Sequence, residues 1–134
     1  MLKPAFEARR VTLGIETAVA TVRGERVLLR EALVNLLQNA LDFSPAGGTV
    51  TLHGAVEAGR VNFTVEDSGS GVPDYALSRV FERFYSLPRP GSTRKSTGLG
   101  LALVREIAHL HGGDAVLENR KEGGARAVFW VPAE

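Results

Sequence analysis

Apolar residues recur every three or four positions in two long stretches of the chain, residues 25–43 and residues 98–113. A period of this kind indicates a helix with one buried face. The buried face expected for the first helix comprises Leu29, Leu33, Leu36, Leu37, Ala40 and Leu41. The face expected for the second comprises Leu99, Leu103, Val104 and Ile107. The pattern therefore predicts two long amphipathic helices.

Elsewhere apolar and polar residues alternate with a period of two, which is typical of strands. Residues 49–67 and residues 114–132 each contain two such runs around glycine-rich turns, which predicts two hairpins. Residues 10–24 are rich in β-branched residues and predict a strand with a short second one. Residues 74–85 predict a short helix, and residues 86–97 a loop.

The predicted order is strand, helix, hairpin, short helix, loop, helix, hairpin. Helices that are apolar on one face must bury that face, and the sheet is the available partner. We therefore expect an α+β fold, a two-layer α/β sandwich with a mixed, mainly antiparallel sheet covered on one face by helices. With 134 residues the chain has room for one domain, 1–134.

Composition excludes several classes of function. The chain has 44% hydrophobic and 23% charged residues and a net charge of +1, which gives no case for binding nucleic acid or a membrane surface. It has no cysteine, so disulfides and thiolate metal sites are excluded. His53, His109 and His111 are too few and too scattered to predict a zinc site. No apolar run approaches the ~20 residues of a membrane span.

Two asparagines stand out in the first helix. Asn35 and Asn39 are one turn apart, on a face next to the apolar one, and Glu31 lies one turn before them. Asparagine is a mediocre helix residue, and an unpaired buried amide costs about 1–3 kcal/mol. Either both amides are solvated or bonded to neighbouring backbone, or they face a polar ligand; the helix alone leaves both interpretations open.

The end of the second predicted strand of the first hairpin carries a carboxylate. Val61, Phe63, Val65 and Asp67 share one face by alternation, so Asp67 points toward the core and should meet a donor. Gly69 and Gly71 would let a flat ligand approach the backbone. The alternative is an aspartate that starts a turn and pairs with backbone amides.

The second long helix begins with two glycines after a basic loop. Free N–H groups and the positive end of the dipole at a helix N-terminus suit phosphate. The preceding loop carries Arg89, Arg94 and Lys95, and the alternative is a solvated loop with Thr97 as the helix cap. A P-loop motif is absent, and Gly98 and Gly100 do not fit a dinucleotide fingerprint.

Four motifs occur together in a characteristic order. They are Asn35-x-x-x-Asn39-Ala40, Asp67-x-Gly69-x-Gly71, "FERFY" at 81–85 and Gly98-Leu99-Gly100-Leu101. Together they resemble the N box, first glycine box, F box and second glycine box of the catalytic ATP-binding domain of bacterial sensor histidine kinases, which share their fold with gyrase, Hsp90 and MutL. The resemblance covers a core of about residues 10–132. "DFSP" and "PDYALSRVFERFYSLPRP" further resemble the CreC type of sensor kinase.

The resemblance implies ATP and Mg²⁺ as cofactors and assigns roles to single residues. Asn39 matches the Mg²⁺ ligand, Asn35 the catalytic phosphate-side position, and Asp67 the carboxylate that accepts from the adenine amino group. Phe43 matches the aromatic residue beside adenine, and residues 86–97 the lid over the phosphates. The ATP-binding set implied in this way is Asn35, Asn39, Phe43, Asp67, Gly69, Gly71, Val72, Tyr85, Arg94, Lys95, Thr97, Gly98, Leu99, Gly100 and Leu101.

The chain departs from the family pattern at two positions. Many sensor kinases carry Lys or Arg three residues after the second asparagine, where this chain has Asp42. The final hairpin often carries Thr after its glycine, where Ala125 follows Gly124. A phosphate cation and a hydroxyl group are therefore missing at these two positions.

The resemblance implies a domain that donates the γ-phosphoryl group of ATP to a histidine on a separate dimerisation domain. Relatives that hydrolyse ATP, and the related anti-sigma serine kinases, carry a glutamate where this chain has Asn35, and an amide cannot serve as a general base. No histidine of the chain has the sequence context of a phospho-acceptor. The alternative is a binding-only module of a degenerate kinase, which Asp42 keeps open.

The partners implied are the dimerisation and histidine phosphotransfer domain of the same parent protein and a response regulator. The parent would be a homodimeric inner-membrane sensor. The domain itself would be cytoplasmic, without contact to membrane or nucleic acid.

Overall fold

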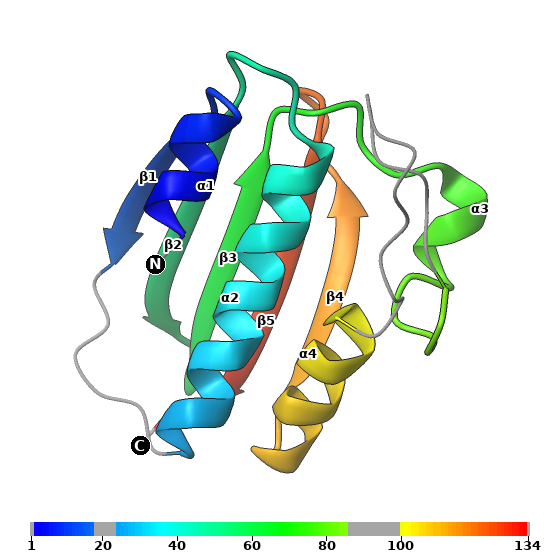
Figure 1. The fold of residues 1–134 in the computed structure, drawn as a ribbon. Helices are drawn as coiled ribbons and strands as arrows, with labels where there is room; N and C mark the ends of the chain where they lie inside the picture. The colour runs from blue at the N-terminus through cyan, green and yellow to red at the C-terminus, as the bar shows by residue number, and fades with distance from the viewer. Residues whose placement is uncertain (1, 18–23, 86–99, 134) are drawn as a thin grey trace.

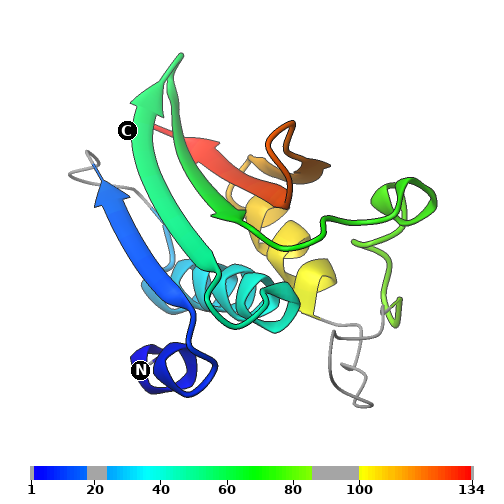
Figure 2. The same ribbon diagram turned by 90° about the horizontal axis from the view of Figure 1, so that it is seen from above.

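Five strands form one sheet, and the helices that pack on it lie on one of its faces (Figure 1 and Figure 2). The computed structural model describes residues 2–17, 24–85 and 100–133. The strands are β1 (Thr12–Thr17), β2 (Thr49–Glu57), β3 (Arg60–Asp67), β4 (Asp114–Asn119) and β5 (Ala125–Pro132). Their order in the sheet is β1-β2-β3-β5-β4, with β1 parallel to β2 and the other pairs antiparallel. The predicted α+β sandwich is confirmed.

The helices are α1 (Lys3–Ala8), α2 (Arg26–Phe43), α3 (Asp74–Leu77) and α4 (Gly100–Leu110). Helices α1, α2 and α4 cover one face of the sheet, while α3 lies beyond the β4 side (Figure 1). The core between the layers contains Leu36 and Leu41 from α2, Val104 and Ile107 from α4, and Phe129 from β5. No helix in the described ranges is long and apolar enough to span a bilayer.

Three features differ from the sequence-based prediction. Helix α1 was not predicted, yet its Phe6 is buried in the core. Helix α3 ends at Leu77, the chain after it runs in turns, and a helix continuing to residue 85 is excluded by the φ of 66° at Phe84. Leu103 is exposed, because the buried face of α4 is formed by Ala102, Val104, Ile107 and Ala108. The described residues exclude 18–23, within the stretch 10–24 that was predicted to hold a second short strand, and 86–99, which includes the predicted basic loop at 86–97.

Helices α2 and α4 run antiparallel and contact each other at both ends of α4. At its start, a Cβ on Gly100 would lie 3.0 Å from Asn35 Oδ1, so glycine permits the close approach. Just past its end, His111 Nε2 accepts a hydrogen bond from the backbone N–H of Glu25, at 3.0 Å. Because Nε2 accepts, the proton sits on Nδ1, which donates to the carbonyl of Ile107 at 2.8 Å. One imidazole thus joins the end of α4 to the start of α2.

The turn from α4 into β4 depends on Gly113. Its N–H donates to the carbonyl of Ala108 at 2.8 Å. A Cβ at this position would lie 1.7 Å from the carbonyl oxygen of Trp130 on β5, so no side chain fits without moving the backbone.

We therefore expect Gly113→Ala to lower the free energy of unfolding by about 2 kcal/mol or more, because the added methyl group overlaps main-chain atoms. Gly47→Ala is the matched control, since Gly47 has a φ of 85° but a Cβ on it would meet nothing within 4 Å. That control should cost only about 1 kcal/mol of conformational strain. Urea unfolding of both variants measures the difference, and equal losses would contradict the steric account.

Candidate functional site

Asp67 is a buried carboxylate at the end of β3, with 6% of its surface exposed. It follows Val61 and Val65 on the inward face of the strand, as the alternation predicts. Its Oδ1 accepts hydrogen bonds from the backbone N–H of Gly69 at 2.9 Å and of Ala125 at 3.2 Å. Both bonds go to the same oxygen, and within the described part of the chain Oδ2 receives none. The second oxygen is therefore available to a donor from outside the chain.

Burial dominates the electrostatics of Asp67. Removal from water raises the pKa of its carboxyl group above the usual aspartate value. The two backbone hydrogen bonds and the charge of Arg120 act in the opposite direction and offset part of that effect. The two N–H groups and Arg120 therefore reduce the free-energy cost of burying the charged form of this carboxylate.

Gly69 brings the loop after β3 against the end of α2. A Cβ on Gly69 would lie 2.5 Å from the carbonyl oxygen of Phe43, the last residue of that helix. The predicted aromatic residue, Phe43, and the predicted carboxylate, Asp67, are therefore brought to the same end of the sheet through this contact.

Gly71 and Val72 are fixed by a residue that the sequence did not single out. Asn119, the last residue of β4, accepts from the N–H of Val72 and donates to its carbonyl, both at 2.7 Å. Gly71 has a φ of 81°, and a Cβ on it would lie 2.7 Å from Asn119 Oδ1. A glycine is therefore needed for both conformation and space, and the side-chain amide of Asn119 clamps the loop.

The two asparagines of α2 differ in their surroundings. Asn35 donates from Nδ2 to the carbonyl of Glu31 at 2.8 Å, which matches the interpretation of an amide bonded to its own helix. Its Oδ1 faces Gly100 at the start of α4. Asn39 is half-buried, and its amide makes no hydrogen bond with any described residue. No described residue therefore uses the amide oxygen of Asn39, and an amide oxygen is a hard ligand that suits Mg²⁺.

A pocket of about 420 Å³ opens beside Asn35, between α2 and α4. It is lined by Glu31, Asn35, Arg83, Phe84, Gly100, Ala102, Leu103 and Glu106. Arg83 forms an ion pair with Glu106 at this pocket. The pocket includes the start of α4 but none of the residues around Asp67, so it marks only one end of the predicted site.

The remaining predicted residues are placed as follows. Asp42 accepts from Gln38 Nε2 at 2.9 Å, a pair within α2. Tyr85 packs under the guanidinium of Arg79, 4.8 Å from the ring centroid, and Leu101 packs against the core. Arg94, Lys95, Thr97, Gly98 and Leu99 lie outside the described residues.

Sequence reasoning missed the turn between β4 and β5. Arg120 Nη1 donates to the backbone carbonyl of Asp67 at 2.8 Å. A Cβ on Gly124 would lie 2.0 Å from the same carbonyl oxygen, so the turn packs directly on Asp67. The only sequence signal was the turn "KEGG", which predicted a hairpin but not its neighbour.

The sequence matches the family model described as histidine kinase-, DNA gyrase B-, and HSP90-like ATPase over residues 24–134. It is 50% identical to the sensor protein CreC of Escherichia coli over 119 residues, which is 89% of this chain and 25% of that protein. It is 41% identical to the sensor protein QseC of Escherichia coli O157:H7 over 122 residues, 90% of this chain and 25% of that protein. The chain spans about a quarter of the length of these curated relatives.

Solved structures show the same fold. The mycobacterial sensor histidine kinase MprB matches with a TM-score of 0.83 and 26% identity, covering 99% of this chain and 89% of that one. Full-length ShkA in complex with AMPPNP matches with a TM-score of 0.83 and 29% identity, covering 98% of this chain and 27% of that one. The chain therefore belongs to the histidine kinase-, DNA gyrase B- and HSP90-like ATPase family, and its relatives within that family are sensor histidine kinases.

Proposed function

We propose that this chain is the ATP-binding catalytic domain of a sensor histidine kinase, which presents the γ-phosphoryl group of ATP to a histidine on a separate dimerisation domain. One observation carries the proposal over a hydrolysing ATPase. At the position where hydrolysing relatives have a glutamate, this chain has Asn35, whose amino group already donates to the Glu31 carbonyl. An amide in this state cannot take a proton from water. The nucleophile should therefore come from another domain.

The residues at the end of the sheet fit the adenine base. Asp67 offers one unpaired carboxylate oxygen inside a largely buried site, which suits the exocyclic amino group of adenine. The loop that carries Gly69, Gly71 and Val72 is fixed in place by the Phe43 and Asn119 contacts, and its glycines would let a flat ring approach the backbone. Guanine has a carbonyl at the corresponding position and would place an acceptor against an acceptor.

The helix pair fits the phosphates and Mg²⁺. Mg²⁺ usually takes one or two protein ligands together with substrate phosphates and water, and the unpaired amide oxygen of Asn39 would supply one. Gly100 and Leu101 would present backbone N–H groups at the start of α4. Arg94, Lys95, Thr97, Gly98 and Leu99 would complete the phosphate side. Bound Mg·ATP supplies the phosphoryl group, while these residues orient it.

The partners follow from the same proposal. A dimerisation domain of the same parent protein would supply the histidine, and a response regulator would receive the phosphoryl group. ThkA, whose structure is known in complex with the response regulator TrrA, shares this fold. We place the domain in the cytoplasm, as part of a homodimeric membrane sensor.

Asp67→Asn should weaken ATP binding at least about tenfold, or about 1.4 kcal/mol, because the amide can place a donor against the adenine amino group. The wild-type chain should bind GTP weakly. Calorimetric titration with both nucleotides measures this, and equal affinity for ATP and GTP would exclude the assignment of Asp67.

The same substitution should stabilise the nucleotide-free domain at neutral pH. A carboxyl group whose pKa is raised by burial contributes stability that is present below the unfolded-state pKa and lost as the pH rises through the folded-state pKa. Asn keeps the neutral form at every pH, so the gain should appear at pH 7 and vanish near pH 3.5. Urea unfolding at both pH values tests this, with Glu57→Gln on the exposed β2–β3 turn as the control for loss of one negative charge.

The isolated chain should bind ATP but show negligible ATP hydrolysis and form no acid-labile phosphohistidine, because Asn35 stands in place of the water-activating glutamate and no histidine of the chain has the sequence context of a phospho-acceptor. Added to the dimerisation domain of its parent, it should phosphorylate that domain slowly, since the link that raises the effective concentration is missing. Asn39→Ala should abolish this transfer and weaken Mg²⁺-dependent ATP binding about tenfold or more, while Mg²⁺-free binding is unchanged.

Radiolabelled ATP assays measure both hydrolysis and transfer. Robust hydrolysis by the isolated chain would favour an ATPase over the kinase domain. Tight ATP binding without transfer, even in the intact parent, would show a binding-only module instead.

A further inference from the structure

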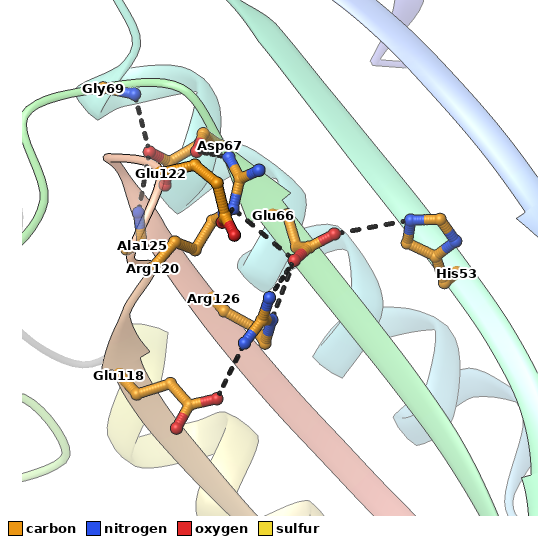
Figure 3. A network of polar contacts seen from close by, with 9 residues as sticks. All are labelled: His53, Glu66, Asp67, Gly69, Glu118, Arg120, Glu122, Ala125 and Arg126. Carbon is orange, nitrogen blue, oxygen red and sulfur yellow. Dashed lines mark hydrogen bonds and ion pairs between the residues drawn. The ribbon is translucent and has the colours of Figure 1, made fainter.

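Arg120, on the turn between β4 and β5, contacts the last two residues of β3, Glu66 and Asp67 (Figure 3). On one side its Nη1 donates to the carbonyl of Asp67 at 2.8 Å. On the other its Nε lies 3.5 Å from Oε2 of Glu66, whose side chain points to the open face of the sheet. The guanidinium therefore lies between the backbone of the candidate adenine-binding residue and an acidic side chain behind it.

The position of Arg120 is unusual for a surface hairpin. Its side chain is 23% exposed, and its Nε is buried without a hydrogen bond in the described part of the chain. The acidic groups nearest to Nε are Glu66 at 3.5 Å and Glu122 at 3.6 Å, both longer than a good hydrogen bond. Burying a guanidinium group whose Nε has no hydrogen bond is unfavourable for folding. We therefore expect Arg120 to contribute to function.

We propose that Arg120 is a positioning residue for nucleotide recognition: it fixes the backbone of Asp67 and keeps the adjacent carboxylate charged, so that Oδ2 can accept from the base. This inference rests on the proposed role of Asp67 in binding ATP. Arg120 itself does not touch the nucleotide.

The hydrogen bonds of the hairpin show how Arg120 can position Asp67. The carboxylate of Asp67 is oriented by two N–H groups, and one of them belongs to Ala125 on the same hairpin as Arg120. The hairpin is closed by the Arg120 N–H, which donates to the carbonyl of Gly124 at 2.9 Å. The backbone of Arg120 thus closes the turn, and its side chain attaches the turn to Asp67. The same turn orients the carboxylate of Asp67 through the N–H of Ala125.

Electrostatics supplies the other part of this role. The charged groups around the end of β3 are Arg120 and Glu122 on the turn, Glu66 on β3 and Asp42 near the end of α2, while β2 places the apolar Val50 opposite Asp67. Arg126 on β5 is a second cation beside Glu66, but Arg120 is the one whose charge lowers the pKa of the Asp67 carboxyl group, against the larger effect of burial. Without that charge the carboxylate would take up a proton at a higher pH and lose its capacity as an acceptor.

Arg126 provides a matched control on the same hairpin. It also pairs with Glu66, from Nε and Nη2 at 2.7 Å each, and with Glu118 at 3.3 Å. It makes no hydrogen bond to Asp67 among the described residues, and Figure 3 shows it on the far side of Glu66. Removing either arginine leaves Glu66 with one cation fewer, but only Arg120 contacts Asp67.

The test is the affinity for Mg·ATP as a function of pH, measured by calorimetry over the pH range in which the protein stays folded, on the wild-type chain, Arg120→Gln and Arg126→Gln. Wild-type affinity should be highest at the alkaline end and fall as the pH drops through the pKa of Asp67. Arg120→Gln should lower affinity about fivefold at pH 7, the effect of one lost hydrogen bond, and move the fall to higher pH. Arg126→Gln should leave the midpoint of the fall where it is in the wild type.

A purely structural role for Arg120 would lower thermal stability without moving that midpoint, so an unchanged midpoint in Arg120→Gln overturns the inference. Wild-type protein that fails to bind ATP would instead count against the proposed function. Should Arg120→Gln not fold, Arg120→Lys keeps the charge but loses the planar donor set. Arg120→Lys should then keep the wild-type midpoint with about threefold weaker binding at every pH, and wild-type affinity in that variant would overturn the positional role.

Discussion

A carboxylate buried at the end of the central strand constrains the part of the structure around the candidate site. Asp67 can be buried there only because backbone N–H groups from two other segments converge on one of its oxygens. This convergence requires the loop after β3 and the start of β5 to come within hydrogen-bond distance, which only glycine permits at positions 69 and 124. Gly69 and Gly124 thus make room for the hydrogen-bond donors of Asp67.

Helix α2 connects the two halves of the candidate site. Its last residue, Phe43, contacts the Gly69 loop, and Asn35 in its middle contacts Gly100 at the start of α4. Asn39 lies between these contacts, one turn from each. The length of this one helix therefore sets the distance between the Gly69 loop, next to the candidate adenine-binding residue Asp67, and the start of α4, the candidate phosphate side.

Much of this could be read from the sequence, because periods of two and 3.6 residues follow directly from which side chains face the core. The face containing Val61, Val65 and Asp67 was predicted in that way and is confirmed. Alanines weaken the same signal: Ala102 and Ala108 are buried in α4, while the more hydrophobic Leu103 is exposed. Asn119 and Arg120 could not be found at all, since their partners Val72 and Asp67 are 47 and 53 residues away along the chain. Contacts of this kind exist only after the sheet has formed.

Helix α4 is attached very differently at its two ends. Its C-terminal end is held by the His111 bond to Glu25, by the tight fit of Gly113 on Trp130, by the ion pair of Arg105 with Asp114 and by the hydrogen bond between His109 and Asp114. At its other end the first residue, Gly100, lies close beside Asn35 of α2. Over the about 16 Å of an 11-residue helix, a small rotation about the C-terminal end would give its largest displacement at the opposite tip, the first residue of α4. That tip is the end of α4 that borders the candidate phosphate site.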